Sequence, residues 1–442
     1  MVYDAIVIGG RCSGASISML LARGGHRVLL LDKMRFPSTT LSTHMLKPRA
    51  MGYMQRWGLR DKLAEVTPVH NAFVFGRDGI RLMGAPTADA LARRMRTIHG
   101  ETCTAEDEHI EIACVKRNVL DSILVQAAEE SGAEIRQECT VEGLIREGDR
   151  VVGVRLRTPA GVVEERARII IGADGRHSQT RNWVDAPVQA VSEQCTYTVY
   201  SYYEGIPAEC SRPGVFLSGR LGVGLGETND GHTMISVFGP SDWFREFRAD
   251  MEDNILRTVD ICFPELGTAM RETGKRADRI FGTTDLSNVM RKAHGDGWLL
   301  LGDAACHLDQ CTAIGITHAF RDAALAGQWV GKALSNELPM DEALASYSKI
   351  RDTEMKTQFD YVSRVSECRI PSAEQMGFYA ALSDDEAALS RFLGFGASIV
   401  PRDDYFNDDE IRNLSKKGLS MTHAENAWNS MCMELEQNPW AA

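Results

Sequence analysis

The N-terminal segment of the chain, residues 4–33, carries the pattern that most restricts its fold. Residues 4–8 form a short β-branched apolar run, and a glycine turn follows directly. The next segment, "SISMLLARGG", has the apolar spacing of a helix and ends at Gly24 and Gly25, and "HRVLLLDK" then indicates a second buried strand. A strand, a glycine turn, a helix and a strand in this order predict a βαβ unit, and continuously apolar strands predict a parallel sheet.

The turn of this unit has the spacing of a dinucleotide-binding fingerprint, GxGxxG. Gly9 supplies the tight turn and Gly14 the close packing of helix on strand, while Arg11 stands where the middle glycine is expected. The helix that begins near Ser13 offers free N–H groups and a positive dipole end to an anion. Asp32 ends the second strand, where a carboxylate accepts hydrogen bonds from a ribose diol. The pattern therefore predicts a dinucleotide site; the alternative is a glycine turn of some other α/β protein.

The acidic residue also restricts the choice of dinucleotide. A carboxylate at Asp32 repels a ribose 2′-phosphate, so this site is not expected to hold NADPH. NAD and FAD both remain open at this point, and the C-terminal half of the chain decides between them.

The rest of the chain either extends this unit or departs from it. A helix at 118–132, a hairpin and a buried strand up to residue 175 extend it, and "GWLLLGDAA" (297–305) repeats the pattern of buried strand and glycine turn. Between about 190 and 285, aromatic alternation and turn signals predict an inserted, mostly antiparallel domain, and a charged helical tail follows from about 340. We therefore predict an α/β protein with a Rossmann-like domain of residues 1–73, 100–187 and 285–340, a β-sheet domain of 74–99 and 188–284, and a C-terminal helical region of 341–442.

Composition and charge exclude several classes of function. The net charge of −12 argues against nucleic acid as a partner, because a phosphate backbone attracts basic proteins. No run of eighteen apolar residues predicts a membrane span, and the N-terminus lacks the basic region of a signal peptide. The eleven cysteines include no CxxC pair, which favours reduced thiols over a disulfide framework. We expect a cytoplasmic monomer or homodimer.

Motifs in three separated segments identify a family resemblance. The first is "GGRCSG" with the "LLLDK" that follows it, the second is "IIIGADGRHSQTR" (169–181), and the third is "LLLGDAACHLDQCTAIGITHAFRDA" (299–323). In this order they resemble the flavoprotein monooxygenases of the para-hydroxybenzoate hydroxylase type, whose DG and GD motifs look like the second and third. "RFPSTTLSTHML" (35–46) is similar to a bacterial subgroup of FAD-dependent oxidoreductases that have GARCAG near the start. The resemblance covers most of residues 1–335.

The resemblance implies that the dinucleotide is FAD and that these motifs surround it. Asp303 would accept hydrogen bonds from ribityl hydroxyls, and the helix starting near Gly315 would direct its N–H groups at the flavin pyrimidine. Arg117 would contact the phosphates or the ribityl chain, and Val141 the adenine. The predicted cofactor-binding residues are Gly9, Gly10, Arg11, Ser13, Gly14, Asp32, Lys33, Ser42, Thr43, Arg117, Val141, Asp174, Gly302, Asp303, Gly315 and Ile316.

Some of these assignments have a purely structural alternative. Arg117 could be a solvated residue at a helix start, although an arginine there is not favoured by the helix dipole. Ser42 and Thr43 lie where the family lines the flavin edge, and the alternative for both is simple helix capping. For Arg11 we expect a side chain that turns away from the glycine turn, with its guanidinium near the cofactor or the mouth of the pocket.

The chain also departs from the family's GD motif. After "GDAA" the family usually has a histidine and then two prolines, where this chain has Cys306, Asp309 and Gln310. Ile314 stands where a glutamine is usual. We still expect this chain to bind FAD. The step that these departures put in question is the activation of oxygen.

Cysteines and histidines gather within residues 306–318, but they lack the paired spacing of structural zinc ligands. No metal is predicted there. His307 is assigned instead to the substrate pocket, together with Tyr200 and Tyr202 of the aromatic strand in the inserted domain. The alternatives are a hydrogen-bonded structural histidine and ordinary packing on a sheet face.

The resemblance implies an FAD-dependent monooxygenase. NAD(P)H would bind transiently and reduce the flavin, O2 would give a C4a-hydroperoxyflavin, and one oxygen atom would pass to a small, aromatic or polyketide-like substrate. Because the flavin carries this chemistry, no catalytic residue is predicted. The alternatives are an FAD-dependent reductase of an unsaturated substrate, a flavin-dependent halogenase, which the absence of a WxWxIP motif disfavours, and a non-catalytic flavoprotein-like binding protein, which the DG and GD motifs disfavour.

Overall fold

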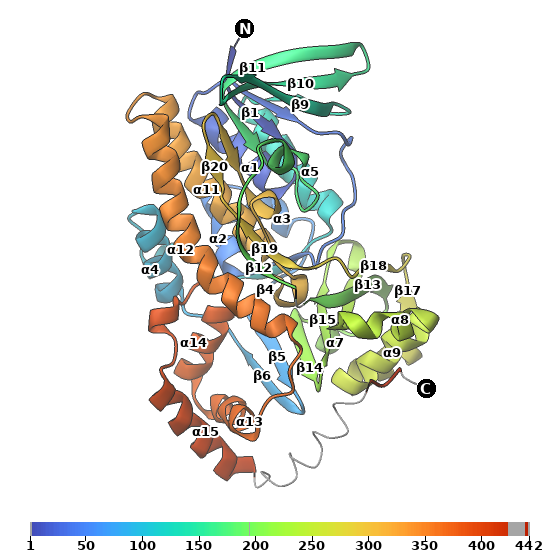
Figure 1. Ribbon diagram of the computed structural model, residues 1–442. Coiled ribbons are helices and arrows are strands. Elements are labelled where there is room, and N and C mark those ends of the chain that lie inside the picture. The colour runs from blue at the N-terminus through green and yellow to red at the C-terminus, as the bar shows by residue number, and fades with distance from the viewer. Residues whose placement is uncertain (1, 194, 423–437, 441–442) are drawn as a thin grey trace.

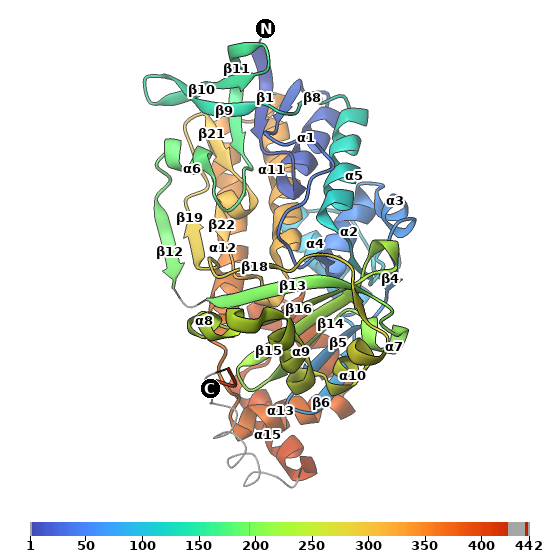
Figure 2. The ribbon, with the colours of Figure 1, turned by 90° about the vertical axis from the view of Figure 1, so that its right-hand side faces the viewer.

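The computed structural model describes residues 2–193, 195–422 and 438–440. The molecule is elongated and has two large sheets, one above the other, with helices packed along them (Figure 1). The N-terminus enters the upper sheet, and the view turned by 90° shows the long strand β13 (Thr196–Glu204) crossing the molecule below this sheet (Figure 2).

The upper sheet is built on the parallel strands expected from the N-terminal βαβ unit. β1 (Val2–Ile8) lies between β11 (Gly161–Gly172) and β2 (Val28–Leu31), and both neighbours run parallel to it. β8 (Glu134–Arg136) continues the sheet beyond β2, and β21 (Trp298–Leu300) continues it beyond β11. β2 and β21 are buried along their whole length, which explains their uninterrupted apolar sequences.

Antiparallel strands extend this sheet at two places. The first half of β11 pairs with β10 (Arg150–Thr158), which pairs in turn with β9 (Thr140–Glu147). The turn between β9 and β10 lies at Gly148, whose φ of +58° favours glycine, so the predicted hairpin is confirmed. At the edge of the sheet, β20 (His294–Gly295) pairs with β21.

Helices pack against the parallel sheet. α1 (Cys12–Arg23) contacts both α5 (Arg117–Glu130) and α11 (Gly315–Leu334). The other helices of this half of the molecule are α2 (Pro48–Arg56), α3 (Arg60–Ala64), α4 (Ala88–His99) and α6 (Gln179–Trp183). Apolar side chains of α1, α2, α4, α5 and α11 join those of the parallel strands in one core. α4, assigned to the second domain by the sequence, therefore packs in the core of the first.

The lower sheet is mostly antiparallel and combines two separate parts of the chain. β5 (Phe73–Arg77) and β6 (Ile80–Gly84) form a hairpin, and β5 joins the inserted segment through a parallel pairing with β14 (Gly214–Ser218). The strands of that segment are β13 (Thr196–Glu204), β14 (Gly214–Ser218), β15 (Leu221–Glu227), β16 (Thr233–Pro240), β17 (Lys275–Arg276) and β18 (Phe281–Thr283). The accompanying helices are α7 (Ala208–Ser211), α8 (Phe244–Phe247), α9 (Met251–Cys262) and α10 (Pro264–Glu272).

Small sheets connect the two halves. One consists of β3 (Met45–Leu46), β7 (Ile112–Cys114) and β4 (Val69–His70). The other consists of β12 (Val188–Ser192), β19 (Asn288–Arg291) and β22 (Cys306–His307). Short 3₁₀ turns lie at Ala105–Asp107, Asn229–Gly231, Ser241–Trp243, Arg248–Asp250, Gly302–Ala304, Gln310–Thr312, Leu382–Asp384 and Arg402–Asp404.

The C-terminal region is helical in its described part, as predicted. It consists of α12 (Met340–Ser366), α13 (Ala373–Ala381), α14 (Glu386–Gly396) and α15 (Asp408–Thr422). α12 runs from beside the upper sheet down to the level of the lower one (Figure 1). α13 and α14 pack against β5 and β6, where Phe75 and Leu82 share a core with Phe378 and Leu389. The predicted helical tail also includes residues 423–437 and 441–442, which lie outside the described residues.

The predicted fold class is confirmed, since a parallel sheet with a βαβ unit, a mostly antiparallel second sheet and a helical C-terminal region are all present. Of the helices in the described ranges, none combines the length and apolar character that crossing a membrane requires.

Candidate functional site

The carboxyl ends of β1, β2, β11 and β21 meet at one edge of the parallel sheet. Gly9 follows β1, Asp32 follows β2, Asp174 comes just after β11, and Gly302 comes just after β21. In open α/β sheets, ligands bind outside the carboxyl ends of the strands. The fold therefore brings together residues that were predicted from separate motifs.

The glycine turn after β1 has no room for side chains. Gly9 has a φ of +101°, and a Cβ there would lie 2.4 Å from the carbonyl oxygen of Ala173. A Cβ on Gly14 would lie only 1.8 Å from the carbonyl oxygen of Gly9. The N–H of Gly10 donates to Asp32 Oδ2 at 2.6 Å, so Asp32 itself closes the turn. A carboxylate accepts several hydrogen bonds, which leaves Asp32 able to accept from a ribose as well.

The start of α1 offers unpaired donors at this turn. No side chain caps the helix, and its first turn contains no acidic residue. Free N–H groups and the positive end of the helix dipole suit a diphosphate. Together with the missing side chains at Gly9 and Gly14, this arrangement fits the pyrophosphate of a dinucleotide such as FAD.

Arg11 points away from the turn, in the direction expected from the sequence. Its guanidinium lies 2.7 Å from Asp121 Oδ2 and donates to Ser38 Oγ and the Thr39 carbonyl oxygen at 3.1 and 3.3 Å. It also lies 5.8 Å from the centre of the Phe36 ring. The arginine at the position of the middle glycine thus joins the turn to α5 and to the loop after β2. Its predicted contact with the cofactor stays a prediction.

Asp121 is a fully buried carboxylate held between two arginines. Arg117 donates to both of its oxygens, at 2.9 and 3.1 Å, and the Cys12 thiol lies 3.6 Å from Oδ1. Burial opposes the charge on Arg117, but attraction to Asp121 and Asp303 raises the pKa of Arg117 above its usual value. Burial raises the pKa of Cys12 to about 12, which keeps the thiol neutral. Arg117 and Asp303, predicted from different motifs, are therefore close enough for their charges to interact.

The aspartates of the DG and GD motifs have different environments. Asp174 accepts from Ser178 Oγ at 2.5 Å and from the N–H groups of Gln179 and Thr180 at 2.9 and 3.0 Å. Its carboxylate thereby caps the start of α6, which is a structural role. Asp303 is exposed at the edge of the sheet, where its carboxylate could accept hydrogen bonds from a ligand.

α11 begins at the same edge with an open N-terminus. No side chain caps it, Gly315 is exposed, and a Cβ on Gly315 would meet nothing within 4 Å. Ile316 is buried behind it. Asp309 fixes the preceding loop by accepting from the N–H groups of Thr196 and Cys311, at 2.7 and 2.9 Å. N–H groups that face open space at the start of a long helix suit the electron-rich edge of a flavin.

The remaining predicted cofactor residues lie around the same edge. A Cβ on Gly302 would lie 2.9 Å from Ser13 Oγ, so the first and third motifs are in contact. Lys33 is exposed directly after Asp32. Val141 is half-buried near the start of β9, close to Cys139, whose N–H donates to the Asp32 carbonyl oxygen at 3.0 Å.

The loop before β3 contains Ser42 and Thr43. Ser42 Oγ accepts from the N–H of His44 at 3.1 Å and so stabilises a local turn rather than a helix. The His44 side chain is 1% exposed, and its Nε2 lies 2.6 Å from the Tyr202 hydroxyl. Burial, together with the nearby charge of Arg117, lowers the pKa of His44 to about 3, so the ring is neutral. This pair joins the loop to β13 of the second sheet.

An apolar cavity of about 240 Å³ lies between the second sheet, the start of α11 and the C-terminal helices. Its wall includes Thr43, Met45, Phe73, Phe75, Val215, Leu217, Met234 and Phe238, residues 310–313, and Tyr361, Tyr379, Phe392, Leu393 and Tyr405. Because residues 310–313 directly precede α11, the cavity meets the place predicted for the flavin. Enclosed apolar cavities with a few polar groups are the usual form of small-molecule sites.

Lys47 is the one charged side chain among the described residues that line this cavity. Its Nζ donates to the Gly396 carbonyl oxygen at 2.8 Å and lies 5.9 Å from the centre of the Phe73 ring. Burial lowers the pKa of Lys47 to about 8. Lys47 was not among the residues predicted from the sequence, although "HMLKPRA" contains a signal, since the lysine directly follows a short apolar run.

The residues predicted for the substrate pocket are not among those that line the cavity. Tyr200 and Tyr202 form a small apolar cluster with Met234, which does line it. His307 Nδ1 lies 2.9 Å from the Ser287 carbonyl oxygen, as in a structural histidine. A role for these three residues in substrate binding stays a prediction. In the described part of the chain, no group of His, Cys, Asp and Glu side chains is placed to hold a metal ion.

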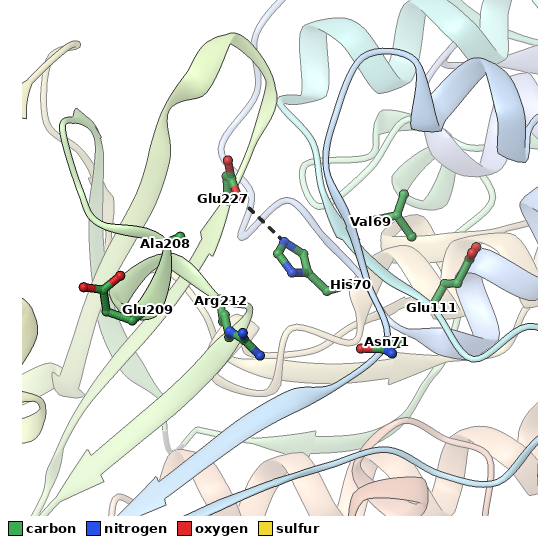
Figure 3. Close-up of a pocket in the computed structure, with 8 residues that line it drawn as sticks. All are labelled: Val69, His70, Asn71, Glu111, Ala208, Glu209, Arg212 and Glu227. Carbon is green, nitrogen blue, oxygen red and sulfur yellow. Dashed lines mark ion pairs between the residues drawn. The ribbon is translucent and has the colours of Figure 1, made fainter.

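A second hollow, of about 630 Å³, opens on the outside between β4 and the α7–β15 region (Figure 3). His70 and Glu227 face each other across it, 3.9 Å apart, and burial lowers the pKa of His70. Arg212, Glu209 and Glu111 add charged side chains to its wall. No residue of the FAD motifs lies in this hollow, so we place the functional site at the sheet edge and the apolar cavity.

The chain is similar to known FAD-binding proteins. The model of the FAD binding domain family matches residues 2–205, and that of the FAD dependent oxidoreductase family matches residues 116–315. A digeranylgeranylglycerophospholipid reductase of Methanosarcina acetivorans is 24% identical over 345 residues, which are 76% of this chain and 76% of the relative. The protein is an FAD-dependent oxidoreductase. The family matches also support FAD binding.

Solved structures show that the oxidoreductase has a widespread fold. A flavin-dependent brominase superposes with a TM-score of 0.76 at 16% identity, covering 96% of this chain and 100% of the brominase. The p-nitrophenol 4-monooxygenase of Pseudomonas putida superposes with a TM-score of 0.74 at 15% identity, covering 91% and 99% of the two chains. This likeness shows that the chain shares its fold with these proteins. It does not single out the para-hydroxybenzoate hydroxylase type.

Proposed function

We propose that this oxidoreductase is a monooxygenase that uses NAD(P)H and O2 to oxygenate a small, mainly apolar organic substrate. The observation that carries the proposal is the apolar cavity that meets the start of α11. Its volume of about 240 Å³ lies below the range of about 300–1,000 Å³ that is common for drug-sized ligands, so it suits a compact substrate. Such a cavity can hold a substrate and keep water away from the reacting atoms.

The chain's own residues position the reactants. The glycine turn and α1 would bind the pyrophosphate, and Asp32 and Asp303 would orient the sugar hydroxyls. Bound FAD supplies two-electron redox chemistry and, after reduction, reactivity toward O2. In the balanced reaction, NAD(P)H, a proton, O2 and the substrate C–H give NAD(P)+, water and the hydroxylated product. The N–H groups at the start of α11 would stabilise negative charge that develops on the reduced cofactor.

Isotope labelling tests this function. The FAD-loaded protein is reduced anaerobically with NADH or NADPH and then mixed with ¹⁸O2 and candidate aromatic or polyketide-like substrates. We expect one ¹⁸O atom in the product and the other in water. A product formed without ¹⁸O would contradict the proposal, and a colourless protein that takes up no FAD would contradict its basis.

A second candidate function is reduction of a substrate double bond. It is favoured by the relative described above, which is named as a digeranylgeranylglycerophospholipid reductase and matches three quarters of the chain. The same experiment separates the candidates before oxygen is added. A reductase would oxidise the reduced flavin anaerobically while a substrate double bond is saturated, whereas a monooxygenase would stay reduced until O2 arrives.

A further inference from the structure

We propose that the substrate of the apolar cavity is an anion, an apolar skeleton with one acidic oxygen group that binds the ammonium group of Lys47. The inference rests on the proposed function, because it concerns the cavity in which that function places the substrate. It extends that function by naming the charge of the substrate and the residue that recognises it.

The position of the ammonium group is fixed by its neighbours. Gly396, which accepts a hydrogen bond from Lys47 Nζ, and Phe73, whose ring faces it, both line the cavity. The Cys311 thiol, in the segment just before α11, is close enough to influence the pKa of Lys47. The charge is therefore part of the cavity wall and lies toward the end of the cavity where α11 begins.

Within the described ranges, the Lys47 ammonium group forms no ion pair with a carboxylate, and its recorded acceptor is a carbonyl oxygen. Gly396 is the last residue of α14, so the negative end of that helix dipole partly compensates the ammonium group. An ammonium group has three donors, of which one is used here. A half-buried charge is costly without a counterion, and an anionic substrate would supply both the charge and the missing acceptors.

The other titratable groups around the cavity stay neutral near pH 7 to 8. Burial raises the pKa values of Cys311, Tyr361, Tyr379 and Tyr405. Burial also lowers the pKa of His318, a residue whose pKa is influenced by the charge of Lys47. Lys47 is thus the group that gives the cavity its charge, and that charge decreases as the pH rises through about 8.

The test measures binding to the FAD-loaded, oxidised protein without a reductant, so that no turnover is needed. The probes are 2-naphthoate and 2-naphthamide, which have the same ring system and nearly the same shape but differ in charge. Dissociation constants come from calorimetry at about pH 7. We expect naphthoate to bind at least about tenfold more tightly than naphthamide, because only the acid pairs with Lys47.

Variants assign the effect to Lys47. Lys47→Met should weaken naphthoate binding about tenfold and leave naphthamide binding within about twofold, while Lys47→Arg should keep the preference for the acid. Lys349→Met removes an equal charge from the exposed side of α12 and should change neither constant. FAD content and the unfolding temperature show that each variant is folded. Equal affinity of the wild type for acid and amide, no binding of the acid, or an unchanged affinity in Lys47→Met would overturn the proposal.

A pH series provides a second readout. In the wild type, the affinity for naphthoate should decrease above about pH 8 as Lys47 loses its proton, whereas Lys47→Arg should keep its affinity up to about pH 9. Binding and oxygenation can fail independently. Preference for the acid without ¹⁸O in any product would support this inference and contradict the monooxygenase proposal. Labelled product from neutral substrates alone would support the monooxygenase proposal and contradict this inference.

Discussion

A single methyl group at position 14 is expected to decide whether the FAD turn forms. A Cβ on Gly14 would lie 1.8 Å from the Gly9 carbonyl oxygen, well inside any real contact distance, and both atoms belong to rigid parts of the turn. We expect Gly14→Ala to unfold the turn and to yield protein with little bound FAD. The ratio of flavin to protein absorbance measures the loss directly.

Gly331→Ala is the matched control for this substitution. Gly331 also lies in a helix, but a Cβ there would have its nearest neighbour, Leu21 Cδ2, at 3.9 Å, an ordinary contact. Alanine is the better helix former by about 1 kcal/mol, so this variant should keep its FAD and be slightly more stable. Equal FAD content in Gly14→Ala and the wild type would contradict the assignment of the turn.

Arg11 gives a second prediction at the scale of single residues. Arg11→Gly would restore the family fingerprint, yet it would remove one of two arginines that hold the buried Asp121. We expect the free energy of unfolding to fall by about 1–3 kcal/mol, because part of the charge of a buried carboxylate is left unpaired. FAD should bind roughly threefold to tenfold more weakly, since Arg11 positions α5 and the loop after β2.

The control removes an equal charge from the neighbouring loop after β2. Arg35 is exposed, so Arg35→Gly should change neither quantity appreciably. Urea unfolding of the apoprotein and fluorescence titration with FAD measure the two effects. If Arg11→Gly left both the stability and the FAD affinity unchanged, the arginine would be merely tolerated at this position.

At the scale of elements, the sequence was most informative where its pattern was regular. The apolar periodicity of β1, α1, β2 and α11 predicted the sheet edge at which we expect FAD to bind, because each of these elements is determined by residues that are close in sequence. The cavity is different. Lys47 and Gly396 are separated by 349 positions, and His44 and Tyr202 by 158, so their contacts depend on how distant elements pack. A single sequence contains no local signal for such contacts.

The contacts that His99 makes with α2 and α11 lead to a prediction about the stability of the protein at acidic pH. His99 ends α4, its Nε2 lies 2.9 Å from the Tyr53 hydroxyl of α2, and its carbonyl oxygen accepts from Gln328 of α11. Burial lowers the pKa of His99 to about 3, below the value of about 6.5 in an unfolded chain. Below pH 6.5 the unfolded state therefore binds a proton that the folded state does not, and stability falls as the pH falls.

His99→Gln should remove this part of the acid sensitivity. Between about pH 6.5 and 5.5 we expect the variant to lose about 1 kcal/mol less unfolding free energy than the wild type, as measured in urea. His177→Gln, at an exposed histidine, should behave as the wild type does. Equal losses for His99→Gln and the wild type would mean that His99 is already protonated in the folded protein.

At the scale of the whole molecule, the two large sheets have separate hydrophobic cores. Buried side chains around the parallel sheet form one core, and those around β13, β15 and β16 form another. The cavity lies where both halves meet the C-terminal helices, so its wall comes from three parts of the chain that are far apart in sequence. This arrangement lets the cavity change without a change in the turn that would hold FAD.

Filling the cavity tests this independence. Leu217 of β14 lines the cavity, and Leu217→Trp would place a much larger side chain in a space of about 240 Å³. We expect 2-naphthoate to bind at least about tenfold more weakly, with FAD content unchanged. Leu217→Met conserves the volume and should bind the probe as the wild type does. If Leu217→Trp bound naphthoate normally, the probe would occupy another site; if it lost FAD, the two halves would be coupled through the cavity wall.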